Sequence, residues 1–209
     1  MARTAIASPW KNGVERKQQR ALKREAVLAA AAQVFSESGY HRASLDEVAR
    51  MLNVTKPTLY YYFKNKEAML FACIEHGLDL LDAAGDGGAT AEATGMERLV
   101  AYLKRYAMVS ETDFGRCAAR ISDMELSEQS RKKVRRVKGV IDRKIRELVA
   151  AGIEDRSIAS SDPKLTAFAL AGALNSIGHW HLDTAGLSGD RIADEYVNLL
   201  VNGLAPRQG

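Results

Sequence analysis

Hydroxyl and ammonium groups that can bind phosphate oxygens or base edges crowd into residues 55–66. These groups belong to Thr55, Lys56, Thr58, Tyr60, Tyr61, Tyr62 and Lys66. A helix that packs into a core spaces its aromatic residues three or four apart, so three consecutive tyrosines are poorly suited to a core. A tyrosine ring packs on protein or on a thymine methyl group while its hydroxyl binds a phosphate oxygen. The segment therefore predicts a surface that binds a partner such as nucleic acid.

The sequence around this segment predicts two helices joined by a tight turn. Residues 44–54 carry apolar side chains at helical spacing, with Ser44 placed as the amino-terminal cap. A second, short helix over 55–63 has Pro57 in its first turn, where a missing N–H costs little. Asn53 lies in the connection and tolerates the left-handed backbone that such a turn needs. The arrangement is that of a helix-turn-helix, whose second helix enters the major groove of DNA.

Two helix starts flank this motif and are suited to backbone phosphates. Ser44 opens the first of its helices, and Asn65 with Lys66 opens the helix that follows it. Free backbone N–H groups at such ends, helped by a lysine, bind anions. The basic segment 16–20 is expected either to follow phosphates or to be a flexible tail.

Helical periodicity continues along the rest of the chain, so an all-α fold is expected. Further helices are predicted over about 22–38, 65–81, 99–106, 116–124, 134–151, 163–180 and 188–204. Strict alternation of apolar and polar residues, the sign of a half-buried strand, is not found in the sequence.

Charge and composition narrow the classes of partner. Residues 1–66 hold 12 Lys and Arg against 5 Asp and Glu, a net charge of +7, while residues 67–209 carry −3. A basic front end favours a polyanionic partner. The chain lacks an apolar run of the roughly 18 residues that span a membrane, and its first residues do not read as a secretion signal. We therefore expect a cytoplasmic protein without a membrane partner.

The sequence offers little support for catalysis or for a bound cofactor. It contains no glycine-rich phosphate loop, no HExxH and no GxSxG, so no catalytic residue is nominated. Cys73 and Cys117 lack metal-ligand spacing, and His179 and His181 point to different sides of a helix, so no metal or cofactor is expected. Two alternatives stay open, an uncharacterised enzyme and a helical module whose basic front binds an acidic protein.

Residues 44–70, SLDEVARMLNVTKPTLYYYFKNKEAML, closely resemble the DNA-binding domain of the TetR family of bacterial transcription repressors. The resemblance covers about residues 22–75 and rests on Leu-Tyr-x-x-Phe, the following Asn-Lys-Glu and both upstream helices. Asn53 and Pro57 depart from the usual pattern without breaking it. The family implies a flexible basic arm over 1–20, a three-helix helix-turn-helix domain over 21–66, and an effector-binding and dimerisation domain over 67–209. It also implies contacts with operator DNA from Ser44, Thr55, Lys56, Thr58, Tyr60, Tyr62 and Lys66.

Residues 175–204 resemble the last two helices of a branch of the family that represses fatty-acid and steroid catabolism, some of whose members respond to acyl-CoA thioesters. The resemblance implies a homodimeric repressor that a small-molecule effector, an acyl-CoA or another apolar ligand, releases from its operator. The expected dimer interface comprises Gly172, Ala173, Ser176, Trp180, Tyr196, Leu199 and Leu200. Small side chains let helices approach closely, although a contact within one chain would need the same residues.

The large or adaptable apolar residues of the second half are the candidates for a ligand pocket. They are Tyr102, Tyr106, Met108, Phe114, Met124, Phe168 and Trp180. Each of them is also explained by an ordinary place in the core. The basic run 131–138 is interpreted as a solvated helix face, with a site for an anionic effector such as a CoA phosphate as the alternative.

Overall fold

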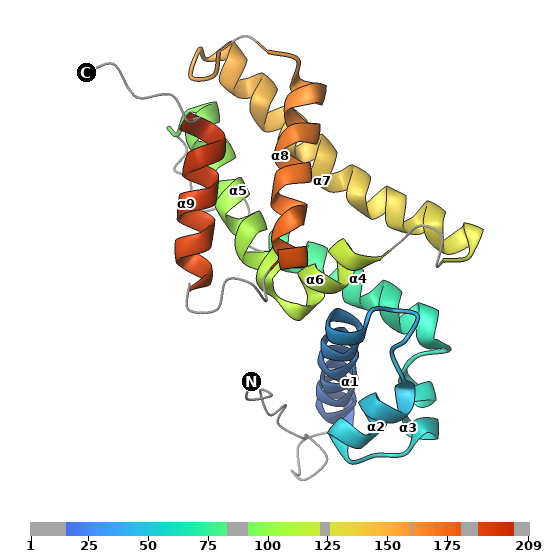
Figure 1. Cartoon of the computed structure of the whole chain (residues 1–209). Coiled ribbons are helices and arrows are strands. Elements are labelled where there is room, and N and C mark those ends of the chain that lie inside the picture. Colours follow the sequence, from blue (N-terminus) through green and yellow to red (C-terminus); the bar gives the residue numbers. More distant parts are fainter. Residues whose placement is uncertain (1–15, 83–91, 122–125, 160, 181–187, 203–209) are drawn as a thin grey trace.

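The computed structural model describes residues 16–82, 92–121, 126–159, 161–180 and 188–202, and in these ranges the chain is helical and without strands (Figure 1). The helices are α1 (Arg16–Ser38), α2 (Leu45–Leu52), α3 (Lys56–Tyr62), α4 (Lys66–Asp82), α5 (Gly95–Glu111), α6 (Asp113–Arg120), α7 (Glu128–Glu154), α8 (Pro163–Trp180) and α9 (Gly189–Asn202). The predicted all-α class is confirmed. Each helix in the described ranges is too short or too polar to cross a bilayer.

Helix α1 ends where the sequence predicts and begins earlier. Gly39 follows it with a φ of 75°, a left-handed conformation that glycine adopts without strain. Its start at Arg16 corrects the expectation of a flexible arm over residues 1–20, because residues 16–20 belong to the helix. The remainder of that arm, residues 1–15, lies outside the described residues. The basic segment 16–20 is therefore the first part of α1.

The turn between α2 and α3 has the predicted geometry. The Ser44 hydroxyl accepts a hydrogen bond from the Asp46 amide at 3.2 Å and caps α2. Asn53 ends the helix with φ 55° and ψ 46°, so the predicted left-handed backbone is confirmed, and its N–H donates to carbonyls of the last turn of α2. Leu59 of α3 and the following Phe63 are buried, and they hold this short helix against the domain.

The core of the smaller domain extends beyond residue 66, where its end was predicted. One cluster of buried side chains joins α1, α2 and α3 to the first half of α4, as far as Ile74, and continues to Cys117 of α6 and Val134 of α7. Leu81, near the end of α4, belongs to the second cluster, in the larger domain. Helix α4 thus runs from one domain into the other, as Figure 1 shows.

Helix α6 connects the two domains by polar contacts as well as by packing. It packs on α1 and α4 of the smaller domain and on α5 and α8 of the larger one. The Ser36 hydroxyl at the end of α1 donates to Asp113 Oδ1 at 2.6 Å. Arg120 donates from Nη1 to the Ser36 carbonyl at 2.5 Å and from Nε to the Gly178 carbonyl at 3.3 Å. One short helix therefore fixes the end of α1 relative to α8.

The left-handed backbone at Asn53 gives a stability prediction. Because alanine lacks the short polar side chain that lets asparagine adopt this conformation, Asn53→Ala should lower the free energy of unfolding by about 1 kcal/mol. Asn53→Gly should keep or raise it, since glycine adopts the same backbone freely. Urea unfolding followed by far-ultraviolet circular dichroism measures both changes. An alanine variant as stable as the glycine variant would contradict the explanation.

Candidate nucleic-acid interface and internal pocket

The outer surface of α3 is aromatic and exposed. Tyr60 and Tyr61 are 45% and 65% exposed, while Leu59 on the opposite side is fully buried. Tyr62 is half-buried, and burial raises the pKa of its hydroxyl. Two of the three predicted contact tyrosines thus face solvent directly, and the third borders the core.

The amino-terminal end of α3 gathers hydroxyl and ammonium groups. Thr55 is the N-cap residue of α3 and has an extended backbone, but its hydroxyl bonds the Thr58 hydroxyl at 3.0 Å and does not cap the helix. Lys56 donates from Nζ to Asp46 Oδ2 at 3.0 Å, so an ion pair links α3 to α2 across the turn. These groups are exposed or half-buried and form one polar end of the helix.

Lys66, which is predicted to contact a phosphate, also makes contacts within the small domain. Its ammonium group donates to the His41 carbonyl at 3.2 Å and lies 4.6 Å from the centre of the Tyr40 ring. Asn65 caps α4 as expected, through a bond of 2.7 Å from the Ala68 amide to its Oδ1. Lys66 thus ties the start of α4 to the loop before α2, and it keeps the two helix starts close together.

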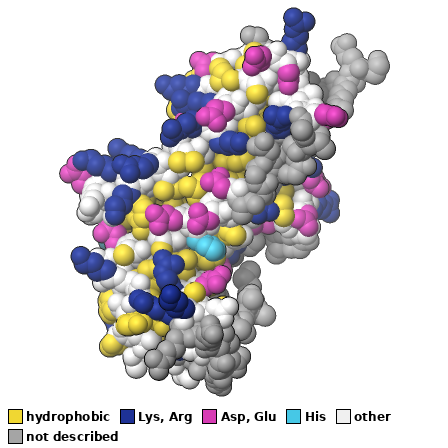
Figure 2. Space-filling view, turned by 180° about the vertical axis from the view of Figure 1, so that it is seen from behind, with side chains coloured by type: hydrophobic (Ala, Val, Ile, Leu, Met, Phe, Trp, Pro, Cys, Tyr) yellow, Lys and Arg dark blue, Asp and Glu magenta, His cyan; other side chains and the backbone are white. Residues whose placement is uncertain are grey.

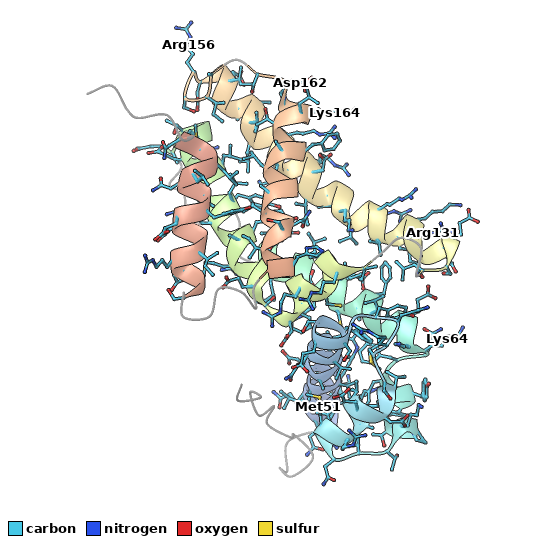
Figure 3. All side chains as sticks on the ribbon, in the orientation of Figure 1. Met51, Lys64, Arg131, Arg156, Asp162 and Lys164 are labelled. Carbon is cyan, nitrogen blue, oxygen red and sulfur yellow. The ribbon has the colours of Figure 1, made fainter. Side chains whose placement is uncertain are left out.

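The structure places Arg20, from the basic segment 16–20, on this surface and adds two basic residues that the sequence analysis did not assign to it. The guanidinium of Arg20 in α1 lies 5.3 Å from the centre of the exposed Tyr61 ring. Arg24, one turn later, lies 4.9 Å from the Phe63 ring. Lys64 is exposed directly after α3 (Figure 3). The four-residue spacing of Arg20 and Arg24 would have indicated a helical face, had α1 been predicted to begin before residue 20.

A cavity of about 120 Å³ lies where the two core clusters meet, between α4, α5, α6, α7 and α8. Its walls are mostly apolar and include Ile74, Leu78, Leu81, Val109, Ala118, Val137 and Ile141. Polar groups come from Ser110, Lys138 and Asn175. The predicted pocket residue Tyr106 lines this cavity and donates from its hydroxyl to Asn175 Oδ1 at 2.8 Å. Burial raises the pKa of Tyr106 to about 12, so the hydroxyl stays a neutral donor.

A second hollow of about 280 Å³ extends the cavity toward the surface between α7 and α8. It shares Tyr106, Lys138, Ile141 and Asn175 with the inner cavity. The predicted residue Phe168 lines this outer part and is 52% exposed. The two hollows therefore form one path, with the ammonium-bearing Lys138 where they meet.

Other residues predicted for the pocket lie elsewhere. Tyr102 of α5 is buried in the second core cluster, and burial raises its pKa. Phe114 packs its ring on His76, with ring centres 4.4 Å apart. Met108 is 41% exposed and lines a separate hollow on α5. Met124 and the side chain of Trp180 lie outside the described residues.

Some residues predicted for a dimer interface make contacts within the chain. The hydroxyls of Ser176 in α8 and Tyr196 in α9 are 3.0 Å apart, and both donate to the Ala173 carbonyl, at 2.6 and 3.1 Å. Leu200 is half-buried against the second core cluster. Gly172 and Leu199 are exposed. Ala173, Ser176 and Tyr196 thus join α8 to α9 within the chain, and the dimer interface itself stays a prediction.

The basic run 131–138 occupies the projecting start of α7. Val134 is buried, and Lys133 lies 5.2 Å from the Phe71 ring of α4. Lys132 pairs with Glu128 at 2.8 Å. This end of α7, on the right in Figure 1 and marked by Arg131 in Figure 3, lies at the left edge of Figure 2, where Lys and Arg side chains gather. The run is largely a solvated face, and Lys138 extends it to the cavity.

Comparison with known proteins matches both parts of the chain. Residues 27–73 match the family described as bacterial regulatory proteins, tetR family, and residues 92–204 match the tetracyclin repressor-like C-terminal domain. The HTH-type transcriptional regulator RutR of Escherichia coli strain K12 is 40% identical over 58 residues, which are 28% of this chain and 27% of RutR. The match thus spans about a quarter of that relative's length.

Solved structures match over most of the chain. AibR in complex with isovaleryl coenzyme A and operator DNA aligns with a TM-score of 0.73 and 25% identity, over 85% of this chain and 97% of AibR. The regulator FadR from Bacillus subtilis in complex with stearoyl-CoA aligns with a TM-score of 0.70 and 20% identity, over 87% of this chain and 99% of FadR, and shows the fold alone. With both domains matched in order, the chain belongs to the TetR family of transcriptional regulators.

Proposed function

We propose that this protein is a dimeric repressor that binds operator DNA and is released from it by an acyl-CoA thioester. The observation that carries the proposal is the exposed surface of α3, held in place from behind by the buried Leu59 and Phe63. A helix supported in this way presents its outer side chains to the major groove without unfolding.

The chemistry of the small domain supports DNA over an acidic protein as the partner. Thr58 and Lys56, at the start of α3, are of the types that bind base edges, and residues at this end of a recognition helix face the bases. Tyr61 and Arg20 form an exposed pair, suited to a phosphate on the flank of the groove. With a net charge of +7 over residues 1–66, binding should weaken steeply as salt rises.

Exposed apolar side chains on α8 and α9 support a dimer. Leu165 and Phe168 on α8 are 65% and 52% exposed, and Leu199 on α9 is 42% exposed. The exposed Gly172 lies one turn after Phe168 and lets another helix approach closely. Two copies joined through this face would present two α3 helices to successive turns of a near-palindromic operator.

The cavity supports an effector with an apolar chain and an anionic head. The inner part is lined by apolar side chains, and Lys138 stands where it meets the outer hollow. The basic residues 131–138 continue from this point along α7, and phosphate groups bind such residues well. Ligand pockets usually measure about 300–1,000 Å³, so the 120 Å³ of the inner cavity favours a short acyl chain. The AibR structure contains isovaleryl coenzyme A, an acyl-CoA of this kind.

Helix α6 provides the connection between the effector and DNA. Gly115, Ala118 and Ala119 of α6 line the inner cavity. The same helix holds the end of α1 through Asp113 and Arg120. A ligand that moves α6 therefore changes the position of α1 and the small domain. By linkage, operator DNA must weaken effector binding by the same factor.

A gel-shift experiment tests the whole proposal. The wild-type protein should select one sequence from a random pool of duplex DNA, and it should release that DNA on addition of isovaleryl-CoA but not of free coenzyme A. An enzyme or an acidic-protein module would select no DNA sequence. Effector affinity that is unchanged by saturating operator would contradict the coupling through α6.

Thr58→Ala is expected to change sequence preference. Its hydroxyl is at the base-facing end of α3 and its loss leaves Leu59 and the fold in place. Selection from the random pool should show roughly fivefold weaker preference at one or two operator positions. An unchanged preference profile would assign base reading to other residues.

Ala118→Leu should separate DNA binding from release. The larger side chain fills part of the inner cavity, so release should need a roughly tenfold higher isovaleryl-CoA concentration, while operator affinity stays near the wild-type value. Ala150→Leu, the same change at an exposed position of α7, is the control and should leave both properties unchanged. Equal release of the two variants by isovaleryl-CoA would mean that the effector binds elsewhere.

A further inference from the structure

Asp46 places a carboxylate on the surface that is proposed to face DNA phosphates. It lies in the first turn of α2, and its side chain is 63% exposed. Its Oδ2 accepts the bond of 3.0 Å from Lys56 Nζ and lies 3.5 Å from the Ser44 hydroxyl. A negative charge at this position opposes the approach of a phosphate backbone, so its presence there needs an explanation.

Stabilisation of the first turn of α2 explains only part of the contacts that Asp46 makes. An acidic residue in the first turn interacts favourably with the helix dipole, and Glu47 occupies the same turn. Neither point accounts for the pairing of Asp46 with a residue ten positions later, at the start of the recognition helix. The pair crosses the turn and directs the Lys56 side chain toward α2.

The ion pair changes what Lys56 offers to DNA. The bond to Asp46 holds the pKa of Lys56 above its usual value, and the same bond lowers the pKa of Asp46. Both groups are therefore charged near neutral pH, and together they present no net charge to a passing phosphate. An ammonium group has three N–H donors, so two remain once Asp46 has accepted one.

We propose that Asp46 is a positioning residue that sets the sequence specificity of the repressor through Lys56. It restrains the ammonium group from phosphates, which are the same on every DNA, and directs the two free donors at base edges. Guanine, with its O6 and N7 acceptors side by side in the major groove, is the base that such a donor pair fits. The inference rests on the proposed function, since it assumes that α3 lies in the groove.

Exposed ion pairs contribute little to folding stability, so the effect of Asp46 should show in DNA binding and not in the fold. On scrambled DNA, where Lys56 has no base partner, the carboxylate cancels one phosphate contact. On the operator, the guanine contact uses the orientation that Asp46 imposes. Asp46 thus weakens binding to scrambled DNA more than it weakens binding to the operator.

The test compares Asp46→Asn with wild type on the operator selected by the wild-type protein and on a scrambled duplex, over a series of salt concentrations. The variant should bind scrambled DNA more tightly, with a slope of log affinity against log salt steeper by about 0.9. Its ratio of operator to scrambled affinity should fall by roughly tenfold, the value of one base contact. Asp79→Asn, an equal charge change at an exposed position near the end of α4, should leave the ratio unchanged.

The same substitution in a Lys56→Met background shows whether Asp46 acts through Lys56. A general charge effect tightens both DNAs equally in either background, so the affinity ratio is the diagnostic measurement. We expect Asp46→Asn to leave the ratio of the Lys56→Met protein unchanged. A ratio that does not fall in the wild-type background, or that falls equally in both, would overturn the inference. A wild-type protein that selects no sequence would instead refute the proposed function.

Discussion

Burial of Leu59 and Phe63 against the small domain is the interaction on which the rest of the structure depends. A seven-residue helix is unstable alone, because the free-energy cost of nucleating a helix exceeds the gain from the hydrogen bonds of one or two turns. These two side chains, 0% and 5% exposed, supply the missing stability from one side. The remaining positions of α3 are then free to carry tyrosine, threonine and lysine, of which only Tyr62 packs against the core. The inner side of α3 is therefore held by buried side chains, while its outer side is polar and aromatic.

The sequence could predict the features that depend on single residues, but not those that depend on packing between helices. Asn53 and Gly39 have backbone requirements that only a few residue types meet, so the turn and the end of α1 were readable from single letters. The extent of the small domain could not be predicted in this way. Residues 67–74 are helical whichever domain they belong to, and only their packing shows that they join the first core cluster. The prediction of where α1 begins was wrong for a related reason. A helix over residues 16–20 has little apolar periodicity that would indicate it.

Residues between helices were the least predictable, because their roles depend on which faces meet. Asn175 and Ser110 are ordinary polar residues in the sequence, and they line a cavity only because α5 and α8 bring them beside Tyr106. The small residues of α8 illustrate the same ambiguity. Ser176 suits a contact with a second chain or with α9, and in the structure its hydroxyl lies beside that of Tyr196 in α9. Aromatic size was a poor guide to the cavity, since Tyr102 and Phe114 pack against other parts of the protein.

Close packing around α6 supports the proposal that a ligand in the cavity acts on the small domain. A Cβ on Gly178 of α8 would lie 3.0 Å from the Ala119 Cβ, and one on Gly77 of α4 would lie 3.6 Å from the Phe114 Cβ. Helix α6 therefore has little free space beside α8 and α4, because protein interiors are close-packed. Any shift that a ligand imposes from the cavity must therefore be shared with α4 and α8. Since α4 continues into the core that supports α3, a ligand-driven shift of α6 would alter how the small domain is held and so the position of the recognition helix.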